Sequence, residues 1–223
     1  MFDAIAPVYD RMNTLMTLGN DGRWRRLAAD AAAVGPGDAV VDVACGTGKL
    51  AVLLAGRVGP FGRVEAVDLS PRMVAHAAAF HHDLVQLHFS VANALALPFE
   101  DCTFDAATIA FGLRNLADYE AGFRELRRVV RPGGRVVCLE LSLPPSRTWA
   151  RIYHATFRRA APLMARIAGG GRSGAYAYLP ASLDGFPDAR SVAATMRSAG
   201  LVDVGFRHLA TGAVALHRGL VAS

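Results

Sequence analysis

The sequence predicts an α/β fold in which a largely parallel β-sheet is covered by helices on both faces. Short apolar or β-branched segments alternate with segments of helical periodicity between residues 39 and 141. A glycine-rich turn at residues 46–48 joins the first of these strands to the helix that follows it. With 223 residues, the chain is long enough to bury a core, and we expect one domain spanning residues 1–223.

The expected elements follow one another in regular order. Five strands are predicted first, at residues 39–44, 63–69, 87–90, 104–110 and 135–141. Helices are predicted between them at residues 49–58, 71–80 and 119–130, and Pro132-Gly133-Gly134 should end the last of these. Two further strands, 201–208 and 213–217, are separated by a tight Thr211-Gly212 turn, so they should pair antiparallel.

Two segments stand outside this alternation. Residues 1–33 have the pattern of two helices, the second carrying Trp24 and Leu27, and are predicted to form an N-terminal helical lid. Residues 145–185 interrupt the pattern after the fifth strand and are predicted to be a helical insertion on the substrate side.

Composition narrows the class of protein. The three cysteines are odd in number and form no Cys-x-x-Cys pair, so neither a disulfide framework nor a metal site is predicted, and a cytoplasmic location fits best. Neither a signal peptide nor a membrane-spanning run is recognised. The net charge of +5 is spread along the chain without a basic block, so nucleic acid is not an expected partner, whereas an anionic membrane surface stays open.

The glycine turn predicts a site for a nucleotide-like cofactor. Gly46 and Gly48 follow a buried strand and open a helix, which points free N–H groups at a bound negative group. The G-x-G-x-x-A spacing, with Asp68 beyond it, also fits a dinucleotide site, so an NAD-dependent oxidoreductase is one alternative.

Three features favour S-adenosylmethionine instead. Asp42 precedes the glycines, where its carboxylate can order the turn and reach the cofactor's ammonium; Asp68 ends the second strand, where it can accept both ribose hydroxyls. Asn93-Ala94 offers an amide oxygen and a backbone N–H to the adenine edge. In the alternative interpretation, Asp42 only caps the turn and Asn93 only fixes a loop.

The chain also resembles a known family, the ubiquinone and menaquinone biosynthesis C-methyltransferases. The resemblance runs nearly end to end through Met1–Ala6, Tyr9-Asp10, Met12-Asn13, Trp24-Arg25, Asp42–Gly48, Ala94–Phe99, Phe111–Asn115, Arg131–Gly134, Leu139–Ser142, Tyr176–Pro180, Ser182, Phe186-Pro187 and Val214–Gly219. It implies the seven-stranded class I methyltransferase (Rossmann-like) sheet with an antiparallel last strand. It also implies that Thr47, Asp68, Asn93 and Ala94 contact the cofactor. Lys49 and Ala110 depart from the family pattern.

The resemblance implies methylation at a ring carbon of a prenylated quinol, with demethylmenaquinol ranked first and a ubiquinone-pathway benzoquinol second. Another aromatic substrate, or a non-catalytic partner protein in quinone synthesis, are further alternatives. Such a reaction needs a phenolate. Arg114, in the segment Phe111–Asn115, is the candidate for stabilising it, Tyr9 for accepting the proton and Asn115 for positioning a water. Asp10, Tyr153 and His154 are other candidates for the base. The alternative for Arg114 is a structural ion pair with an acid such as Asp118.

The insertion after the fifth strand carries one more prediction. Trp149, Ile152, Tyr153 and Phe157 recur at helical spacing, and arginines share another face. Ordinary packing explains the apolar stripe; the alternative is that this helix lines the entrance for a prenyl tail and rests on anionic lipid at the inner face of the cell membrane. Whether the protein is a homodimer stays open.

Overall fold

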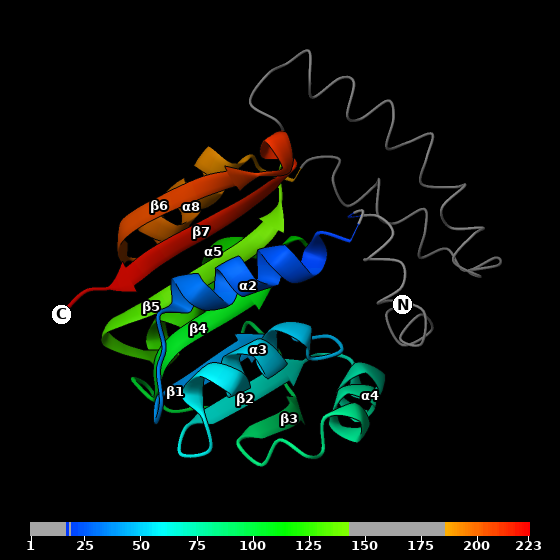
Figure 1. Ribbon diagram of the computed structural model, residues 1–223. Helices are drawn as coiled ribbons and strands as arrows, with labels where there is room; N and C mark the ends of the chain where they lie inside the picture. Colours follow the sequence, from blue (N-terminus) through cyan, green and yellow to red (C-terminus); the bar gives the residue numbers. More distant parts are fainter. Residues whose placement is uncertain (1–16, 18, 143–185) are drawn as a thin grey trace.

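A seven-stranded sheet forms the centre of the protein in the computed structural model, which describes residue 17, residues 19–142 and residues 186–223 (Figure 1). The strand order is β3-β2-β1-β4-β5-β7-β6. The strands are β1 (Ala39–Val43), β2 (Arg63–Asp68), β3 (Leu87–Val91), β4 (Phe104–Ala110), β5 (Val130–Leu141), β6 (Leu201–Leu209) and β7 (Val214–Val221). Strand β7 runs antiparallel to both of its neighbours, β5 and β6, while the other pairs are parallel. The predicted seven-stranded sheet with an antiparallel last strand is confirmed.

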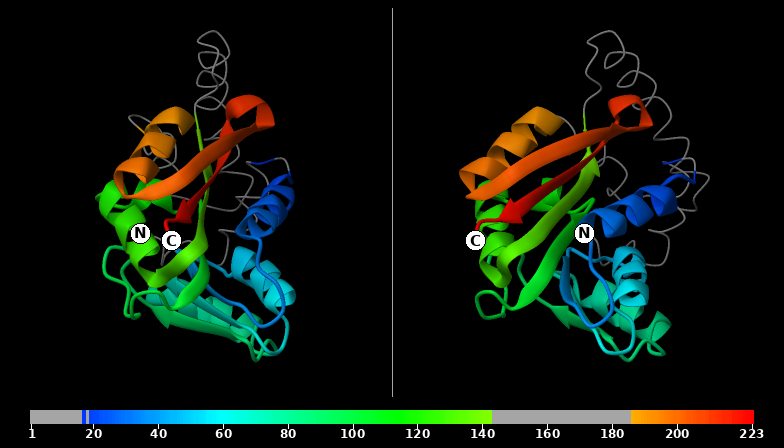
Figure 2. Two further views of the ribbon diagram at one scale, coloured as in Figure 1. Left: turned by 90° about the vertical axis from the view of Figure 1, so that its left-hand side faces the viewer. Right: turned by 60° about the vertical axis from the view of Figure 1, so that its left-hand side comes forward.

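Helices cover both faces of this sheet (Figure 2). They are α2 (Asp21–Ala32), α3 (Lys49–Val58), α4 (Pro71–Phe80), α5 (Tyr119–Val129) and α8 (Ala189–Ser198), with short 3₁₀ turns η2 (Leu113–Asn115) and η3 (Ala210–Gly212). Apolar side chains of α2 and α3 form one buried cluster with the sheet, and those of α5 and α8 form the other. Because side chains alternate along a strand, Val40 faces α2 and α3 while Val41 and Val43 face the opposite layer. Asp42 therefore points to the α2 and α3 side.

Helix α2 is a structural layer of the sheet. It contacts α3, β4 and β5; Ala28 and Ala29 are fully buried, and Trp24 is 9% exposed. The predicted second helix of the 1–33 segment is thus observed, packed into the core. The first predicted helix, and the insertion at 145–185, lie outside the described residues, so the predicted lid and insertion stay predictions.

The element boundaries differ from the prediction in one instructive place. The helix before β5 ends at Val129, close to the expected stop, but the chain enters β5 at once, at Val130 rather than at residue 135. Pro132-Gly133-Gly134 lies within this longer strand, where the pairing with β4 shifts register between Phe104 and Ala106. A proline and a positive-φ glycine (Gly133, φ 78°) are tolerated there because a register irregularity leaves ladder positions unpaired.

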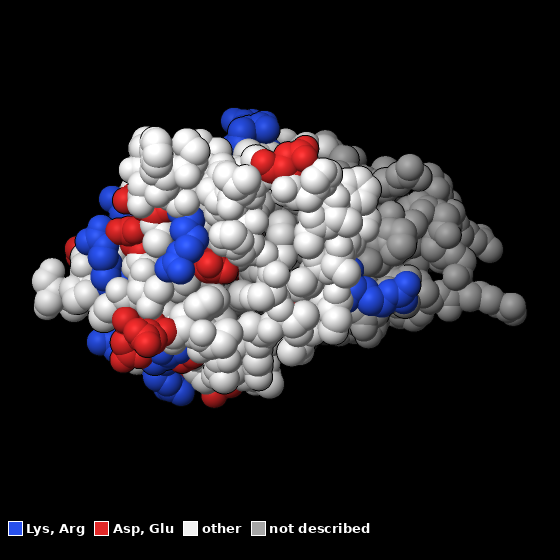
Figure 3. Space-filling model, turned by 90° about the horizontal axis from the view of Figure 1, so that it is seen from below, with Lys and Arg blue, Asp and Glu red and all other residues white. Residues whose placement is uncertain are grey.

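Surface charge of both signs is interleaved. Viewed from below, Lys, Arg, Asp and Glu gather together at the left-hand end of the described surface, and a broad uncharged area occupies the centre (Figure 3). The net charge of +5 is not collected into a basic stripe on this face. Within residues 19–142 and 186–223, no helix is long and apolar enough to cross a membrane, and no cluster of three His, Cys, Asp or Glu suits a metal ion.

Candidate functional site

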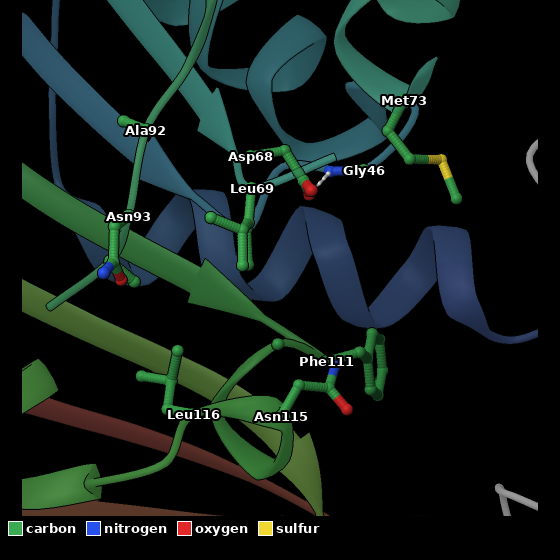
Figure 4. A pocket seen from close by; sticks show the side chains of 12 residues that line it. Gly46, Asp68, Leu69, Met73, Ala92, Asn93, Phe111, Asn115 and Leu116 are labelled. Carbon is green, nitrogen blue, oxygen red and sulfur yellow. Dashed lines mark hydrogen bonds between the residues drawn. The ribbon is translucent and has the colours of Figure 1, made fainter. Parts of the chain in front are cut away.

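A pocket opens where the carboxyl ends of β1, β2 and β4 meet (Figure 4). This is where the chain turns from β1 toward β2 on one side and later returns to β4 on the other, the usual ligand position in open α/β sheets. The pocket encloses about 750 Å³, including space open to solvent. Its lining residues are Ala44, Gly46, Asp68, Leu69, Met73, Ala92, Asn93, Ala94, Phe111, Gly112, Asn115 and Leu116.

The turns after β1 and β4 press against each other at the pocket floor. Ala44 and Phe111 both hold a positive φ (54° and 59°), an unusual conformation for residues with a side chain. A Cβ atom added to Gly112 would lie 2.4 Å from Cβ of Ala44, so only glycine allows the two turns to approach this closely. Backbone strain of this kind concentrates at ligand sites.

The two glycines of the turn have different roles, one in the pocket and one in helix packing. Gly46 (φ 57°) lines the pocket, and its predicted contact with the cofactor stays a prediction. Gly48 (φ 84°) is the N-cap of α3, and a Cβ there would lie 2.8 Å from the Phe89 ring, so this glycine allows the helix to pack on β3. Thr47 is buried, and its carbonyl oxygen lies 3.2 Å from Nε2 of His81. Thr47 and Gly48 shape the turn but do not belong to the residues that line this pocket.

Asp68 lies directly beside Gly46 of the glycine turn in the pocket wall (Figure 4). Its Oδ2 accepts a hydrogen bond from the Gly46 N–H at 2.9 Å, and its Oδ1 accepts one from the Ser70 N–H at 2.9 Å. These bonds fix the carboxylate at the end of β2. Each carboxylate oxygen has a second lone pair, so the fixed group can still accept from a pair of hydroxyls.

Asn93 and Ala94 line another wall of the pocket. The side-chain oxygen of Asn93 accepts a hydrogen bond from the Leu95 N–H at 3.0 Å, so this residue holds its own loop in place. The interpretation of Asn93 as a loop anchor is therefore observed, and its contact with the adenine edge stays a prediction. Leu69 and Leu116 add apolar surface that was not predicted, and Met73 comes from the first turn of α4.

Asp42 lies below the pocket rather than in its wall. It is 1% exposed, and the Thr108 hydroxyl donates to its Oδ1 at 2.6 Å. Burial raises the pKa of Asp42 from 3.8 to about 7, against the opposing effects of the Thr108 hydrogen bond and the nearby charge of Arg25. Its Oδ2 is buried and has no hydrogen-bond donor in the described part of the chain.

The side chain of Arg114 lies in the protein interior, where it forms a buried ion pair. Its guanidinium Nη1 lies 2.5 Å from Oε1 of Glu140 on β5, and it also donates to the Phe111 carbonyl at 3.0 Å. The Glu140 side chain is fully buried and accepts from the Arg114 backbone N–H at 3.2 Å. The acid paired with Arg114 is therefore Glu140. The suggestion of Asp118 is wrong, because Asp118 caps α5 by accepting from the Ala121 N–H.

The segment Phe111–Asn115 thus reaches the pocket through some of its residues only. Phe111, Gly112 and Asn115 line it, whereas Arg114 does not (Figure 4). Lys49, which departs from the family pattern, binds Asp21 of α2 at 3.2 Å. The other predicted participants in proton transfer, Tyr9, Asp10, Tyr153 and His154, lie outside the described residues.

One buried cation beside the pocket was not predicted as a site residue. Arg25 of α2 is 6% exposed, and its guanidinium carbon lies 5.2 Å from the centroid of the Phe111 ring. It was noted only as part of the Trp24-Arg25 motif. The available signal was its spacing, because Arg25 lies three, four and seven positions before Ala28, Ala29 and Ala32 and therefore shares the apolar face of this helix.

Comparison with known proteins gives concordant results. The model of the ubiE/COQ5 methyltransferase family matches residues 1–221. A protein named demethylmenaquinone methyltransferase from Thermus thermophilus is 43% identical over 220 residues, covering 98% of this chain and 99% of the relative. One of the same name from Mycolicibacterium vanbaalenii is 43% identical over 217 residues, covering 97% and 91%.

Solved structures show the fold. A SAM-dependent methyltransferase from Aquifex aeolicus matches with a TM-score of 0.67 at 18% identity, covering 96% of this chain and 98% of that one. A geranyl diphosphate methyltransferase in complex with SAM matches with a TM-score of 0.63 at 21% identity, covering 91% and 86%. The predicted class I methyltransferase fold is confirmed.

Proposed function

The chain belongs to the ubiE/COQ5 methyltransferase family, and on that premise we propose that it transfers a methyl group from S-adenosylmethionine to a ring carbon of demethylmenaquinol, giving menaquinol. The observation that carries this proposal is the 43% identity, over nearly the whole of both chains, to proteins named for that reaction.

The pocket residues fit the proposed cofactor. Asp68, fixed by two backbone N–H groups, is suited to accept from the ribose hydroxyls. Asn93 and Ala94 suit the adenine edge, with Leu69 and Leu116 as apolar surface for its faces. The unbonded Oδ2 of Asp42 is an acceptor for the methionine ammonium, directly or through water. When bound, the sulfonium supplies an electrophilic methyl group.

The residues of this chain must then favour an ionised substrate. A phenol-like hydroxyl has a pKa near ~10, so its ionisation at pH 7 costs about 4 kcal/mol. The ion pair with Glu140 and the hydrogen bond to the Phe111 carbonyl hold the Arg114 guanidinium next to the backbone of a pocket-lining residue. A positive charge fixed in advance stabilises a developing oxyanion without reorganisation. Asn115, which lines the pocket, would position a water or the quinol oxygen, and Tyr9 would accept the proton.

A label-transfer assay tests this proposal. The protein is incubated with methyl-labelled S-adenosylmethionine and chemically reduced demethylmenaquinone, or with the corresponding demethylated benzoquinol. We expect label in menaquinone. Label in the benzoquinone alone would replace the substrate by a ubiquinone precursor. If neither accepts label while the protein binds S-adenosylhomocysteine, the quinol proposal is wrong.

Calorimetry separates the cofactor alternatives. We expect S-adenosylhomocysteine to bind in the micromolar range and NADH not to bind. The reverse result would favour the oxidoreductase that the glycine turn alone allows.

We also infer that the enzyme works from the cytoplasm at the inner face of the cell membrane. A polyprenyl quinol stays in the bilayer, so the protein must approach the lipid surface to reach the ring. This follows from the proposed substrate, and its test is given in the Discussion.

A further inference from the structure

Among the residues that the structure describes, Arg25 is buried without the partners that a buried arginine normally has. The residue is 6% exposed, and within the described part of the chain it forms neither a hydrogen bond nor an ion pair. Its Nε–H in particular is enclosed and has no acceptor. Removing a charged group from water is costly unless charge or hydrogen bonds compensate, so this position requires an explanation.

The neighbours of Arg25 compensate only in part. The guanidinium lies over the ring of Phe111, 5.2 Å from its centroid, and the charge of Asp42 is near. A cation–π contact contributes only about 0.5–2 kcal/mol and satisfies no N–H group. Asp42 gives no hydrogen bond to the guanidinium. Arg25 therefore lies beside the pocket with a buried Nε–H donor that no acceptor in the described residues satisfies.

Its position points to one end of the pocket. Phe111, the ring that Arg25 covers, lines the pocket and lies beside helix α2 in the close-up (Figure 4). Trp24 of the same helix also contacts this ring, at 6.5 Å between centroids. Asp42, at the end of β1, brings an unbonded carboxylate oxygen to the same region. A donor and an acceptor, both buried and incompletely bonded, thus lie near the turn formed by Ala44 and Gly46.

The methionine end of the proposed cofactor has the complementary groups, an α-carboxylate and an α-ammonium on one carbon atom. We propose that Arg25 binds the α-carboxylate of the cofactor, while Asp42 faces the ammonium. This inference rests on the proposed function. It makes Arg25 a specificity residue, because NAD carries no amino-acid group for this pair to recognise. It also ties helix α2 to cofactor binding.

The test compares S-adenosylmethionine with its decarboxylated form, which differ only in the α-carboxylate, with the full chain in a calorimeter. Both carry the ammonium and the same sulfonium, and 5′-methylthioadenosine, which has neither the carboxylate nor the ammonium, is a third ligand. We expect Arg25→Gln to weaken S-adenosylmethionine about 10- to 100-fold, as for lost hydrogen bonds to a charged group. The affinities for the other two ligands should change less than twofold.

Arg26→Gln is the matched control. It is the same change at the next position of α2, on the exposed side, and should leave all three affinities unaltered. If Arg25→Gln weakens all three ligands equally, Arg25 is structural and the inference is wrong.

If Arg25→Gln does not fold, the wild-type protein alone still tests the inference. It must bind S-adenosylmethionine at least tenfold more tightly than the decarboxylated form, and equal affinities would overturn the role of Arg25. The proposed function fails separately, if the wild-type protein binds none of these ligands.

Discussion

At the scale of single residues, Asp42 is a buried carboxyl group that the fold supplies with only part of its hydrogen bonds. The carboxyl group is enclosed on the α2 and α3 side of the sheet, and Thr108 bonds only one of its oxygens. Burial therefore favours the neutral acid, and the pKa rises to about 7. An ammonium group brought to the free oxygen would reverse this preference.

The pH dependence of stability tests this account. In the unfolded chain Asp42 loses its proton near pH 4, but the folded protein keeps it up to about pH 7. This group therefore lowers the free energy of unfolding as pH rises from about 4 to 7, by up to about 4 kcal/mol, and has no further effect above pH 7. Asp42→Asn has no carboxyl group to titrate, so this decrease in the free energy of unfolding should be absent from the variant. In urea denaturation, the variant's advantage over wild type should grow between pH 5 and 7 and then level off.

A pH-independent difference between the two proteins would contradict the burial of Asp42. Thr108→Val provides a second check, because it removes the hydroxyl that favours the ionised form. In that variant the levelling-off should move to higher pH.

Arg114 and Glu140 need a paired experiment, because they hold each other in place. Arg114→Gln alone leaves a buried carboxylate without its cation and should lower the free energy of unfolding by about 3–5 kcal/mol. The double variant Arg114→Gln with Glu140→Gln replaces the ion pair by two neutral amides and should recover most of that loss. If the Arg114 charge stabilises the phenolate, this folded double variant binds S-adenosylhomocysteine normally but turns over more than tenfold more slowly.

The double variant decides whether Arg114 takes part in the reaction, because it removes the Arg114 charge without leaving an unpaired carboxylate in the interior. Turnover within tenfold of wild type would remove Arg114 from the mechanism and leave it the purely structural role that its ion pair already demonstrates.

At the scale of elements, the approach of the β1 and β4 turns sets the shape of the pocket. Gly112→Ala would place a methyl group 2.4 Å from Cβ of Ala44, so the turns must separate. We expect a loss of about 1–3 kcal/mol in stability, by analogy with overpacking, and a weaker affinity for S-adenosylhomocysteine in calorimetry. Gly205→Ala in β6 is the control, since nothing lies within 4 Å of the added atom. Equal behaviour of the two variants would refute the close approach.

Sequence patterns predicted the position of pocket residues that follow strands better than the position of residues that helices bring near the pocket. Gly46, Asp68, Asn93 and Asn115 reach the pocket because the carboxyl ends of parallel strands meet at one edge. The proximity of Arg25 to the pocket-lining Phe111 ring was not predicted, because it exists only after α2 packs on the sheet.

The Arg114–Glu140 pair was missed for the same kind of reason. It joins η2 to β5 across 26 positions of the chain. Local periodicity carries no information about such a contact, and Asp118, the nearer acid in sequence, is engaged as a helix cap instead.

At the scale of the whole molecule, the proposed substrate lies in a lipid bilayer, but no helix in the described residues is long and apolar enough to span one. Its net charge of +5 favours anionic lipid. We expect sedimentation with liposomes that contain anionic lipid, reduced by high salt, and little binding to neutral liposomes. Binding that ignores both lipid charge and salt would exclude an electrostatic contact.

The position of β7 has a consequence for the order of folding. This strand, the last described along the sequence, lies between β5 and β6, and β7 is the one described strand with which β6 pairs. During synthesis, β6 therefore leaves the ribosome before the neighbour that joins it to the sheet. Until residues 214–221 emerge, the β5 edge stays open to pairing with other chains. We infer that closing this gap is a late event in biogenesis, and that ribosome-bound nascent chains lacking β7 are the form most exposed to aggregation.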